Sequence, residues 1–290
     1  MQKTLFMIHP HGFCPGVRNA LNIVNQALQD YSQQTIYVFN EIVHNKTIVT
    51  NLKNKGVIFT QNCADIVAKS VVILSAHGVS PDVKKTLLSK NCILIDATCH
   101  FVNKVHQEVI DYSKKGYHII YIGTKNHEET LGVVGENPSN ITIIETDADF
   151  ANIKVDADKY VVLNQTTLNL DDIENLFKKI KIKFTNVVFP STADLCLATK
   201  SRQSGLKKVL NQCDLVIIIG SQNSSNSRKL RDIALKNGKT TYLIDNYQEI
   251  KNEWLKNHYN IALTAGASAP EFLVTETIKF LTHKGYRLIK

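Results

Sequence analysis

Three stretches of the chain repeat one order of features, and this repetition constrains the fold more than any other property of the sequence. Each stretch opens on a cysteine placed just before a helical pattern, and a strand that ends in a polar loop follows. Self-similarity at a fixed period indicates a repeated architecture, so the chain reads as three copies of one unit of about 90 residues. The cysteine and the polar loop residue lie 30, 28 and 28 positions apart in the pairs Cys14 and His44, Cys99 and His127, and Cys196 and Ser224.

Short apolar runs alternate with amphipathic stretches along all three copies. Val17, Ala20 and Val24 recur at the helical spacing of three and four, and Val102 and Val105 do the same. This alternation predicts an α/β architecture with mostly parallel sheets. Strands are predicted at the runs 35–39, 71–74, 93–95, 118–122, 141–144, 160–163, 215–219, 241–244 and 261–263.

The repeats also set the expected domain borders, since no long linker or low-complexity stretch divides the chain. We expect a first α/β repeat with Cys14 at 1–97, a second with Cys99 at 98–194, and a third with Cys196, plus a C-terminal segment, at 195–290. Ligands of parallel sheets bind at the loops off the carboxyl ends of the strands. Three units related by a pseudo-threefold axis would aim these loops, and the three cysteines, at one centre.

Charge and hydropathy exclude several classes of protein. The formal charge is +8, but the 34 basic residues are scattered without a block of five like charges, so no nucleic-acid partner is expected. No apolar stretch approaches the roughly 20 residues of a membrane-spanning helix. Only four apolar residues, 5–8, follow the first positions, so we expect no signal peptide and a cytoplasmic location.

The six cysteines are expected to be thiols, metal ligands or catalytic groups. Three of them, Cys63, Cys92 and Cys213, have no equivalents in the other repeats and are predicted to be small buried side chains. The three repeated cysteines suit a soft metal centre, and the short ligand spacing of structural zinc sites is absent. An iron–sulfur cluster normally takes four cysteines, so three would leave one iron open for catalysis.

The strand-end loops carry side chains that suit an anion. Histidine can donate to an anion, and serine and asparagine donate hydrogen bonds, so a ring of them suits a phosphate or diphosphate. The stretch 223–227 predicts a helix N-terminus, which either binds phosphate through its N–H groups or only caps the helix. The predicted donors are His44, His77, His127, Thr166, Ser224, Ser225, Asn226 and Ser268.

One carboxylate, Glu129, is predicted to donate a proton. Near an anionic ligand and out of bulk water, such a group would keep a proton available near neutral pH. The other two candidates, Glu128 and Glu41, are expected to be solvated.

The motifs together carry a resemblance to a known family. The chain is similar to the 4-hydroxy-3-methylbut-2-enyl diphosphate reductases, the IspH or LytB family, from about residue 8 to residue 275, in order and at family-like spacing. The matching motifs are Gly-Phe-Cys-Pro-Gly-Val at 12–17, Val-His-Asn at 43–45, Ser-Ala-His-Gly-Val at 75–79, Asp-Ala-Thr-Cys at 96–99, Gln-Thr-Thr-Leu at 165–168, Cys-x-Ala-Thr at 196–199, Gly-Ser-x-Asn-Ser-Ser-Asn-Ser at 220–227 and Thr-Ala-Gly-Ala-Ser-Ala-Pro at 264–270.

The resemblance implies the last step of the non-mevalonate isoprenoid pathway. In that step two electrons and two protons remove the hydroxyl of (E)-4-hydroxy-3-methylbut-2-enyl diphosphate as water, giving isopentenyl and dimethylallyl diphosphates. It further implies that Cys14, Cys99 and Cys196 hold a [4Fe–4S] cluster at the centre of the three units. Ferredoxin or flavodoxin is the implied electron donor.

The resemblance also assigns roles to the loop residues. By analogy with the family, Glu129, His127 and Thr166 surround the substrate hydroxyl as the catalytic group. The diphosphate pocket is implied to contain His44, His77, Ser224, Ser225, Asn226 and Ser268.

One loop departs from the family pattern. Many relatives read Gly-His-x-x-His-Pro-Glu, whereas 123–129 reads Gly-Thr-Lys-Asn-His-Glu-Glu, with Thr124 and Glu128 in place of the first His and the Pro. We expect a looser loop and added negative charge near the site. Two other functions stay open, a non-redox [4Fe–4S] hydro-lyase and a non-catalytic iron–sulfur redox sensor.

Overall fold

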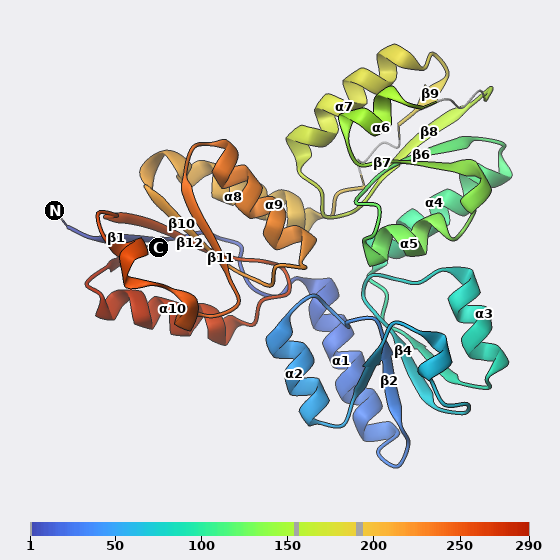
Figure 1. Ribbon diagram of the computed structural model, residues 1–290, viewed down its shortest axis with the longest axis horizontal. Helices are drawn as coiled ribbons and strands as arrows, with labels where there is room; N and C mark the ends of the chain where they lie inside the picture. The colour runs from blue at the N-terminus through green and yellow to red at the C-terminus, as the bar shows by residue number, and fades with distance from the viewer. Residues whose placement is uncertain (1, 154–156, 190–193, 290) are drawn as a thin grey trace. The chain divides into compact units, whose positions relative to one another are not determined.

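The computed structural model describes residues 2–153, 157–189 and 194–289. It contains three α/β repeats, each built on a parallel sheet (Figure 1). The strands are β1 (Thr4–Met7), β2 (Ile36–Phe39), β3 (Ile58–Thr60), β4 (Val71–Leu74), β5 (Ile93–Asp96), β6 (His118–Ile122), β7 (Ile141–Ile144), β8 (Tyr160–Asn164), β9 (Val187–Val188), β10 (Leu215–Ile219), β11 (Thr240–Ile244), β12 (Asn260–Ala265) and β13 (Arg287–Ile289).

The helices follow the strands in alternation. They are α1 (Pro15–Asp30), α2 (Lys46–Asn54), α3 (Pro81–Ser89), α4 (His100–Lys114), α5 (Glu128–Val134), α6 (Asp147–Ala151), α7 (Leu170–Lys183), α8 (Leu197–Val209), α9 (Ser225–Lys236) and α10 (Glu271–His283), with 3₁₀ turns η1 (Cys63–Asp65), η2 (Pro138–Asn140), η3 (Leu210–Gln212), η4 (Tyr247–Glu249) and η5 (Asn252–Leu255). Across the described ranges, none of these helices is long and apolar enough to cross a membrane.

All pairings between strands in the described ranges are parallel, as the alternating pattern predicts. The three sheets have the orders β3-β2-β4-β5, β7-β6-β8-β9 and β11-β10-β12-β1-β13. The nine predicted strands are all confirmed, with ends that differ by at most two residues. Central strands such as β4, β6 and β10 are buried along their whole length, which explains their unbroken apolar runs.

Strand β1 completes the pattern in a way that the sequence did not reveal. In the two four-stranded sheets, the edge strand β5 lies beside β4, and the edge strand β9 lies beside β8. Along the chain, β5 precedes Cys99 and β9 precedes Cys196. The corresponding place beside β12 is taken by β1, which runs toward Cys14. The sheet of the C-terminal repeat therefore contains residues 4–7, from the opposite end of the chain. The domain borders after residues 97 and 194 stay predictions.

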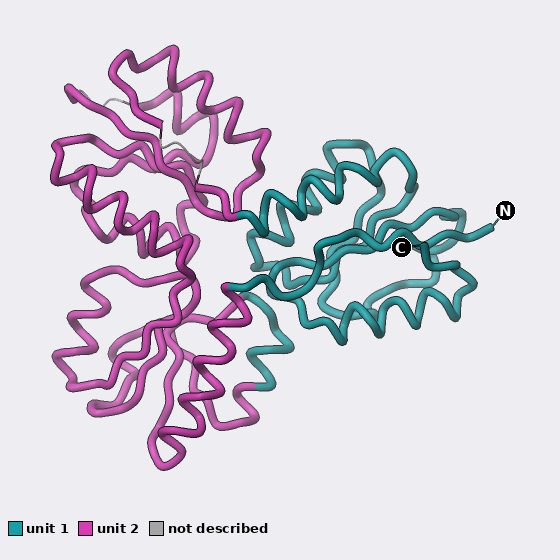
Figure 2. The backbone as a smooth tube through the Cα atoms, turned by 180° about the vertical axis from the view of Figure 1, so that it is seen from behind, with its two compact units in different colours: residues 1–15, 44–51, 197–290 teal, residues 16–43, 52–196 magenta. Residues whose placement is uncertain are grey.

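The chain forms two compact units (Figure 2). The first unit comprises residues 1–15, 44–51 and 197–290 and contains the five-stranded sheet. The second comprises residues 16–43 and 52–196 and contains both four-stranded sheets.

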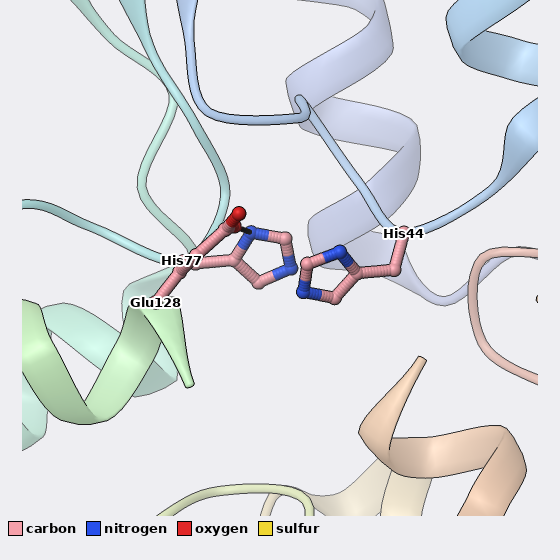
Figure 3. Close-up of side chains that lie close together, drawn as sticks. All are labelled: His44, His77 and Glu128. Carbon is pink, nitrogen blue, oxygen red and sulfur yellow. Dashed lines mark ion pairs between the residues drawn. The ribbon is translucent and has the colours of Figure 1, made fainter. Parts of the chain in front are cut away.

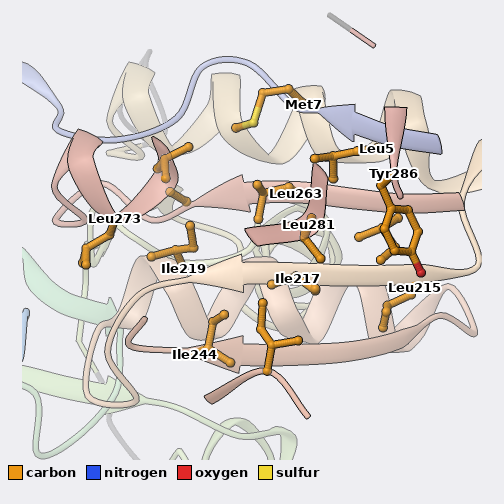
Figure 4. Packing of buried hydrophobic residues seen from close by; sticks show 14 of the residues in the cluster. Leu5, Met7, Leu215, Ile217, Ile219, Ile244, Leu263, Leu273, Leu281 and Tyr286 are labelled. Atoms are coloured by element: carbon orange, nitrogen blue, oxygen red, sulfur yellow. The ribbon is translucent and has the colours of Figure 1, made fainter. Parts of the chain in front are cut away.

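The five-stranded sheet of the first unit is covered on both faces. Leu215, Ile217 and Ile219 of β10 pack with α10 residues such as Leu273 and Leu281 (Figure 4). The alternate residues of β10, Val216 and Ile218, belong to a second cluster with α8 and α9. This division follows from the two-residue period of a strand, which sends neighbouring side chains to opposite faces.

The sheet of β6 to β9 in the second unit has the same two-sided core. Ile120 of β6 packs with Ile173 and Ile180 of α7, whereas Ile119 packs with Val105 of α4 and Val133 of α5. Helices on both faces leave the carboxyl edge of the parallel strands as the place where polar loops gather.

Of the three cysteines without repeat equivalents, two are buried as predicted and one is only partly buried. Cys92 and Cys213 are buried in hydrophobic clusters, and Cys63 is partly buried against the same cluster as Cys92. Burial raises the pKa of the Cys63 and Cys213 thiols, which disfavours the thiolate that binds metals.

A charged cluster lies between α4 and the chain just before α8. Lys104 Nζ lies 3.0 Å from a Glu108 oxygen and 2.7 Å from an Asp194 oxygen. Burial, together with the negative charge of Asp194, raises the pKa of Glu108 to about 7. The folded state therefore binds a proton at Glu108 in a pH range where the unfolded chain has lost it.

This difference gives a test of the fold. Because the folded pKa is raised from 4.5, Glu108 stabilises the protein below that pH, and its contribution is lost as pH rises through about 7. We expect the melting temperature of Glu108→Gln, relative to wild type, to increase between pH 4.5 and 8. Glu174→Gln, at an exposed position of α7, is the control. An equal difference at both pH values would contradict the raised pKa.

Candidate active site

The three predicted cysteine ligands have one backbone environment. Each directly precedes a helix, α1, α4 or α8, and is partly exposed and outside any disulfide. Each cysteine backbone N–H donates to a carbonyl in the loop that follows one strand: β12 for Cys14, β4 for Cys99 and β8 for Cys196. The three bonds run from Cys14 to Ala267 (3.1 Å), from Cys99 to Ala76 (3.0 Å) and from Cys196 to Thr166 (3.2 Å).

This placement favours metal-binding chemistry. The positive end of a helix dipole stabilises a thiolate, and the thiolate is the form that binds a metal. The loop before Cys14 is also held by Arg202 of α8, whose guanidinium is buried and donates to the carbonyl of Gly12. A thiol at a helix start on fixed backbone is the kind of ligand that an iron–sulfur cluster takes.

In the first unit, the start of α9 gathers buried polar side chains. Ser224 is the N-cap residue, and its hydroxyl accepts from the N–H of Ser227. Ser225 and Asn226 form the first turn, and all of these side chains are buried. The N-terminus predicted at 223–227 is thus confirmed, and its N–H groups and dipole suit a phosphate.

Two neighbouring loops are tied to this helix start. The Asn226 side chain accepts from the N–H of Ala267, and the hydroxyl of Ser268 donates to the carbonyl of His44 at 2.8 Å. The amide nitrogen of Asn223 lies 3.4 Å from His44 Nδ1. The predicted diphosphate residues of this unit are therefore joined by hydrogen bonds that run from loop to loop.

Two glycines permit this close approach. A Cβ at Gly220 would lie 2.2 Å from the hydroxyl oxygen of Ser227, and a Cβ at Gly266 would lie 2.0 Å from it. Only glycine lets the loops behind β10 and β12 close onto α9 at these points.

In the second unit, Glu129 and Thr166 form a buried pair. The Thr166 N–H donates to one Glu129 oxygen at 2.7 Å, and the Thr166 hydroxyl lies 3.0 Å from the other. Glu129 is 2% exposed and Thr166 is 4% exposed. Complete burial, with the Glu129 carboxyl nearby, holds the pKa of Tyr121 well above its usual value. A hydroxyl both donates and accepts, so Thr166 can pass a proton that leaves Glu129.

His127 connects this pair to the start of α5. Its Nδ1 accepts from the N–H of Glu129 at 3.2 Å and so caps the helix. A neutral His127 ring therefore carries its proton on Nε2. The ring of His77 meets that of His127 edge to face, with centroids 5.8 Å apart.

Glu128 is the residue that the sequence reasoning misjudged. Its side chain is 13% exposed, and one oxygen lies 2.9 Å from His77 Nδ1, as the dashed line in Figure 3 marks. The prediction of a solvated Glu128 is therefore wrong. Glu41 is only partly exposed. The one available signal was the pair of adjacent acidic residues, which the structure places in the first turn of α5, where carboxylates are favoured.

The structure thus brings the predicted residues into two groups. The first unit contains Cys14, His44, Ser224, Ser225, Asn226 and Ser268. The second unit contains Cys99, Cys196, His77, His127, Glu129 and Thr166.

Comparison with known proteins identifies the family. The profile of the LytB protein family matches residues 5–282. The chain belongs to the LytB protein family. Its curated relatives in the LytB family include proteins named 4-hydroxy-3-methylbut-2-enyl diphosphate reductase. That of Wigglesworthia glossinidia brevipalpis is 43% identical over 96% of this chain and 89% of the relative, and that of Buchnera aphidicola is 41% identical over 98% and 91%.

Solved structures agree with this LytB assignment. The structure of E-1-hydroxy-2-methyl-but-2-enyl-4-diphosphate reductase from Plasmodium falciparum matches with a TM-score of 0.95 and 36% identity, over 100% of this chain and 92% of the other. A second, titled (E)-4-hydroxy-3-methyl-but-2-enyl diphosphate reductase, the terminal enzyme of the non-mevalonate pathway, matches with a TM-score of 0.68 and 29% identity, over 97% and 100%. The resemblance carried by the motifs is confirmed.

The Glu129–Thr166 pair gives a stability test. We expect Thr166→Val to lower the free energy of unfolding by about 1–3 kcal/mol, because it leaves a buried carboxyl oxygen without its hydroxyl partner. Urea unfolding measures the change. Thr275→Val, at an exposed position of α10, is the control and should change the value by less than about 0.5 kcal/mol. Equal effects of the two substitutions would contradict the pair.

Proposed function

We propose that this chain catalyses the reductive dehydroxylation of (E)-4-hydroxy-3-methylbut-2-enyl diphosphate to isopentenyl and dimethylallyl diphosphates. One observation carries the proposal. Each of the three repeated cysteines directly precedes a helix and makes the same type of backbone hydrogen bond, in a chain that matches the LytB family along nearly its whole length. The repetition of the bond supports a shared role for the three thiols, because nothing in an ordinary core requires it.

The cofactor in this proposal is a [4Fe–4S] cluster held by Cys14, Cys99 and Cys196. When bound, the cluster would supply the electrons and act as a Lewis acid on the substrate hydroxyl. Ferredoxin or flavodoxin is the proposed electron donor, since a formal charge of +8 favours an acidic carrier. The proposed location of this chemistry is the cytoplasm.

The residues of the first unit are proposed to bind the diphosphate. The N–H groups at the start of α9 and the hydroxyls of Ser224 and Ser225 are donors for phosphate oxygens. Asn226 and Ser268 are already tied to neighbouring backbone, so they hold the loops in place before the substrate arrives. A site held in this way loses little entropy on binding.

The residues of the second unit are proposed to handle the proton. Glu129 stores it in a buried position, and the Thr166 hydroxyl passes it to the leaving oxygen. His127, with its Nδ1 committed to the helix cap, offers Nε2–H as a donor. His77 is proposed to join the diphosphate donors.

The cofactor proposal predicts iron and sulfide content. After anaerobic purification we expect about four irons and four acid-labile sulfides per chain, and their loss in Ser variants of Cys14, Cys99 and Cys196. Cys63→Ser is the matched control and should retain both, since its thiol lies against a hydrophobic cluster. Full retention in any of the three variants, or loss in the control, would refute this ligand set.

The role of Glu129 predicts a selective loss of turnover. We expect Glu129→Gln to lower kcat about 100-fold or more while the iron content stays at the wild-type value, because the amide has no proton to give at neutral pH. Product formation with excess chemical reductant measures the change. Wild-type turnover in this variant would disprove the proton role. Turnover of wild type without any reductant would instead indicate the hydro-lyase.

A further inference from the structure

We propose that Asp245 is a positioning residue: through the buried hydroxyl of Ser221, it holds the segment that contains His44 in place for diphosphate binding. The proposal rests on the proposed function only in naming diphosphate as the anion. Asp245 directly follows β11, and Ser221 lies in the loop between β10 and α9. Neither residue is among the groups proposed to bind the substrate.

Residues 44–51 join the first unit from a distant part of the chain. In sequence they lie between β2 and β3, whose sheet belongs to the second unit, yet they group with residues 197–290 (Figure 2). The segment begins with His44, and Lys46 is the first residue of α2. Contacts between this segment and residues 197–290 therefore help to fix the place of His44.

Two consecutive hydrogen bonds tie the segment to the carboxyl ends of β10 and β11. The backbone N–H of Lys46 donates to the Ser221 hydroxyl oxygen at 3.1 Å, and that hydroxyl donates to an Asp245 oxygen at 2.5 Å. Ser221 is 0% exposed. Because a hydroxyl has a single proton, the bond to Asp245 fixes its rotation and directs a lone pair toward Lys46. Hydrogen bonds in such a series also polarise and strengthen one another.

These bonds connect two parts of the proposed diphosphate pocket. Lys46 is two residues from His44, whose carbonyl accepts from the Ser268 hydroxyl at 2.8 Å. The Ser221 carbonyl accepts from the N–H of Ser224, the N-cap residue of α9, at 3.0 Å. Ser221 thus contacts the His44 segment with its side chain and the start of α9 with its backbone, and Asp245 orients that side chain.

The negative charge of Asp245 has an opposing effect, because charge alone would repel a diphosphate ion. Lys46 Nζ lies 2.6 Å from the other Asp245 oxygen, but the lysine side chain is 67% exposed. Solvent screens such an ion pair, so its contribution is small. The contact with the buried hydroxyl is the one that supports positioning, and the two effects of Asp245 on diphosphate affinity have opposite signs.

Asp214 provides a matched control at the opposite ends of the same parallel strands. It directly precedes β10, and its carboxylate accepts from the backbone N–H groups of Tyr259 and Asn260 at 3.1 and 3.2 Å. Asp214→Ala therefore removes the same charge from the same unit, together with hydrogen bonds, but leaves the loops at the carboxyl ends unchanged.

The experiment measures the affinity of the anaerobically purified protein for inorganic diphosphate by isothermal titration. We expect Asp245→Ala and Ser221→Ala each to bind about tenfold more weakly, because each breaks the same buried series of hydrogen bonds. The double variant should lose less than about threefold more, since the two residues act as one unit. In Asp245→Ala the KM for the allylic diphosphate should rise about tenfold while kcat changes less than about threefold.

Two further variants separate positioning from charge and from general destabilisation. Asp245→Asn keeps one acceptor oxygen, and the buried Ser221 hydroxyl needs it more than the exposed Lys46 ammonium, which water can solvate. We expect this variant to bind diphosphate within about threefold of wild type, or more tightly. Asp214→Ala should match wild type in affinity even if its melting temperature falls.

The outcomes distinguish this inference from the proposed function. Wild-type or tighter binding by Asp245→Ala, an equal loss in Asp214→Ala or Asp245→Asn, or a hundredfold loss in the double variant would overturn the role of Asp245 and leave the reductase proposal standing. If Asp245→Ala does not fold, wild-type affinity of Ser221→Ala overturns it instead. A wild type that binds no diphosphate would overturn both, whereas binding without turnover would count against the reductase alone.

Discussion

The candidate site depends on one type of backbone hydrogen bond, which occurs three times. In each case the N–H of a cysteine donates to a carbonyl in the loop that follows β4, β8 or β12. Because it uses backbone atoms, it fixes where the chain turns into the helix regardless of the side chain. The thiol then lies at the positive end of that helix. The same bond connects each cysteine to a loop that carries site residues, so in each unit the ligand and the polar groups share one support.

Parallel strands make this arrangement possible. Their carboxyl ends meet at one edge, and helices cover both faces, so the polar residues of a repeat have no other place to gather. In the first unit this edge carries the start of α9 and the loop behind β12, and Gly220 and Gly266 let the two approach closely. In the second, the loops behind β4, β6 and β8 carry His77, His127 and Thr166.

The sequence predicted the central strands and the threefold repeat because both follow from local patterns. The runs of apolar residues mark fully buried strands, and the cysteine spacing marks the repeat. The place of β1 did not follow, since pairing between residues 4–7 and 260–263 joins opposite ends of the chain. The short edge strands β9 and β13 have two and three residues, too few for a periodic pattern.

For the site, sequence patterns indicated which residues take part but not which of them make contact. The Glu129–Thr166 pair joins residues 37 positions apart, and the His77–Glu128 pair joins two different strand-end loops. Both depend on tertiary packing, so spacing alone cannot predict them. Glu128 was expected at the surface, but the packing of the two loops largely buries it beside His77.

The departure at 123–129 shows how packing replaces a local constraint. Without proline the loop was expected to be loose, because proline restricts φ. In the structure three backbone donors of this loop make hydrogen bonds: the Thr124 N–H bonds to the Gln165 side chain, the Lys125 N–H to Glu145, and the His127 N–H to the Thr124 carbonyl. The His127 ring then caps α5. The position that proline occupies in many relatives carries a carboxylate here, and this carboxylate is the acidic partner of His77.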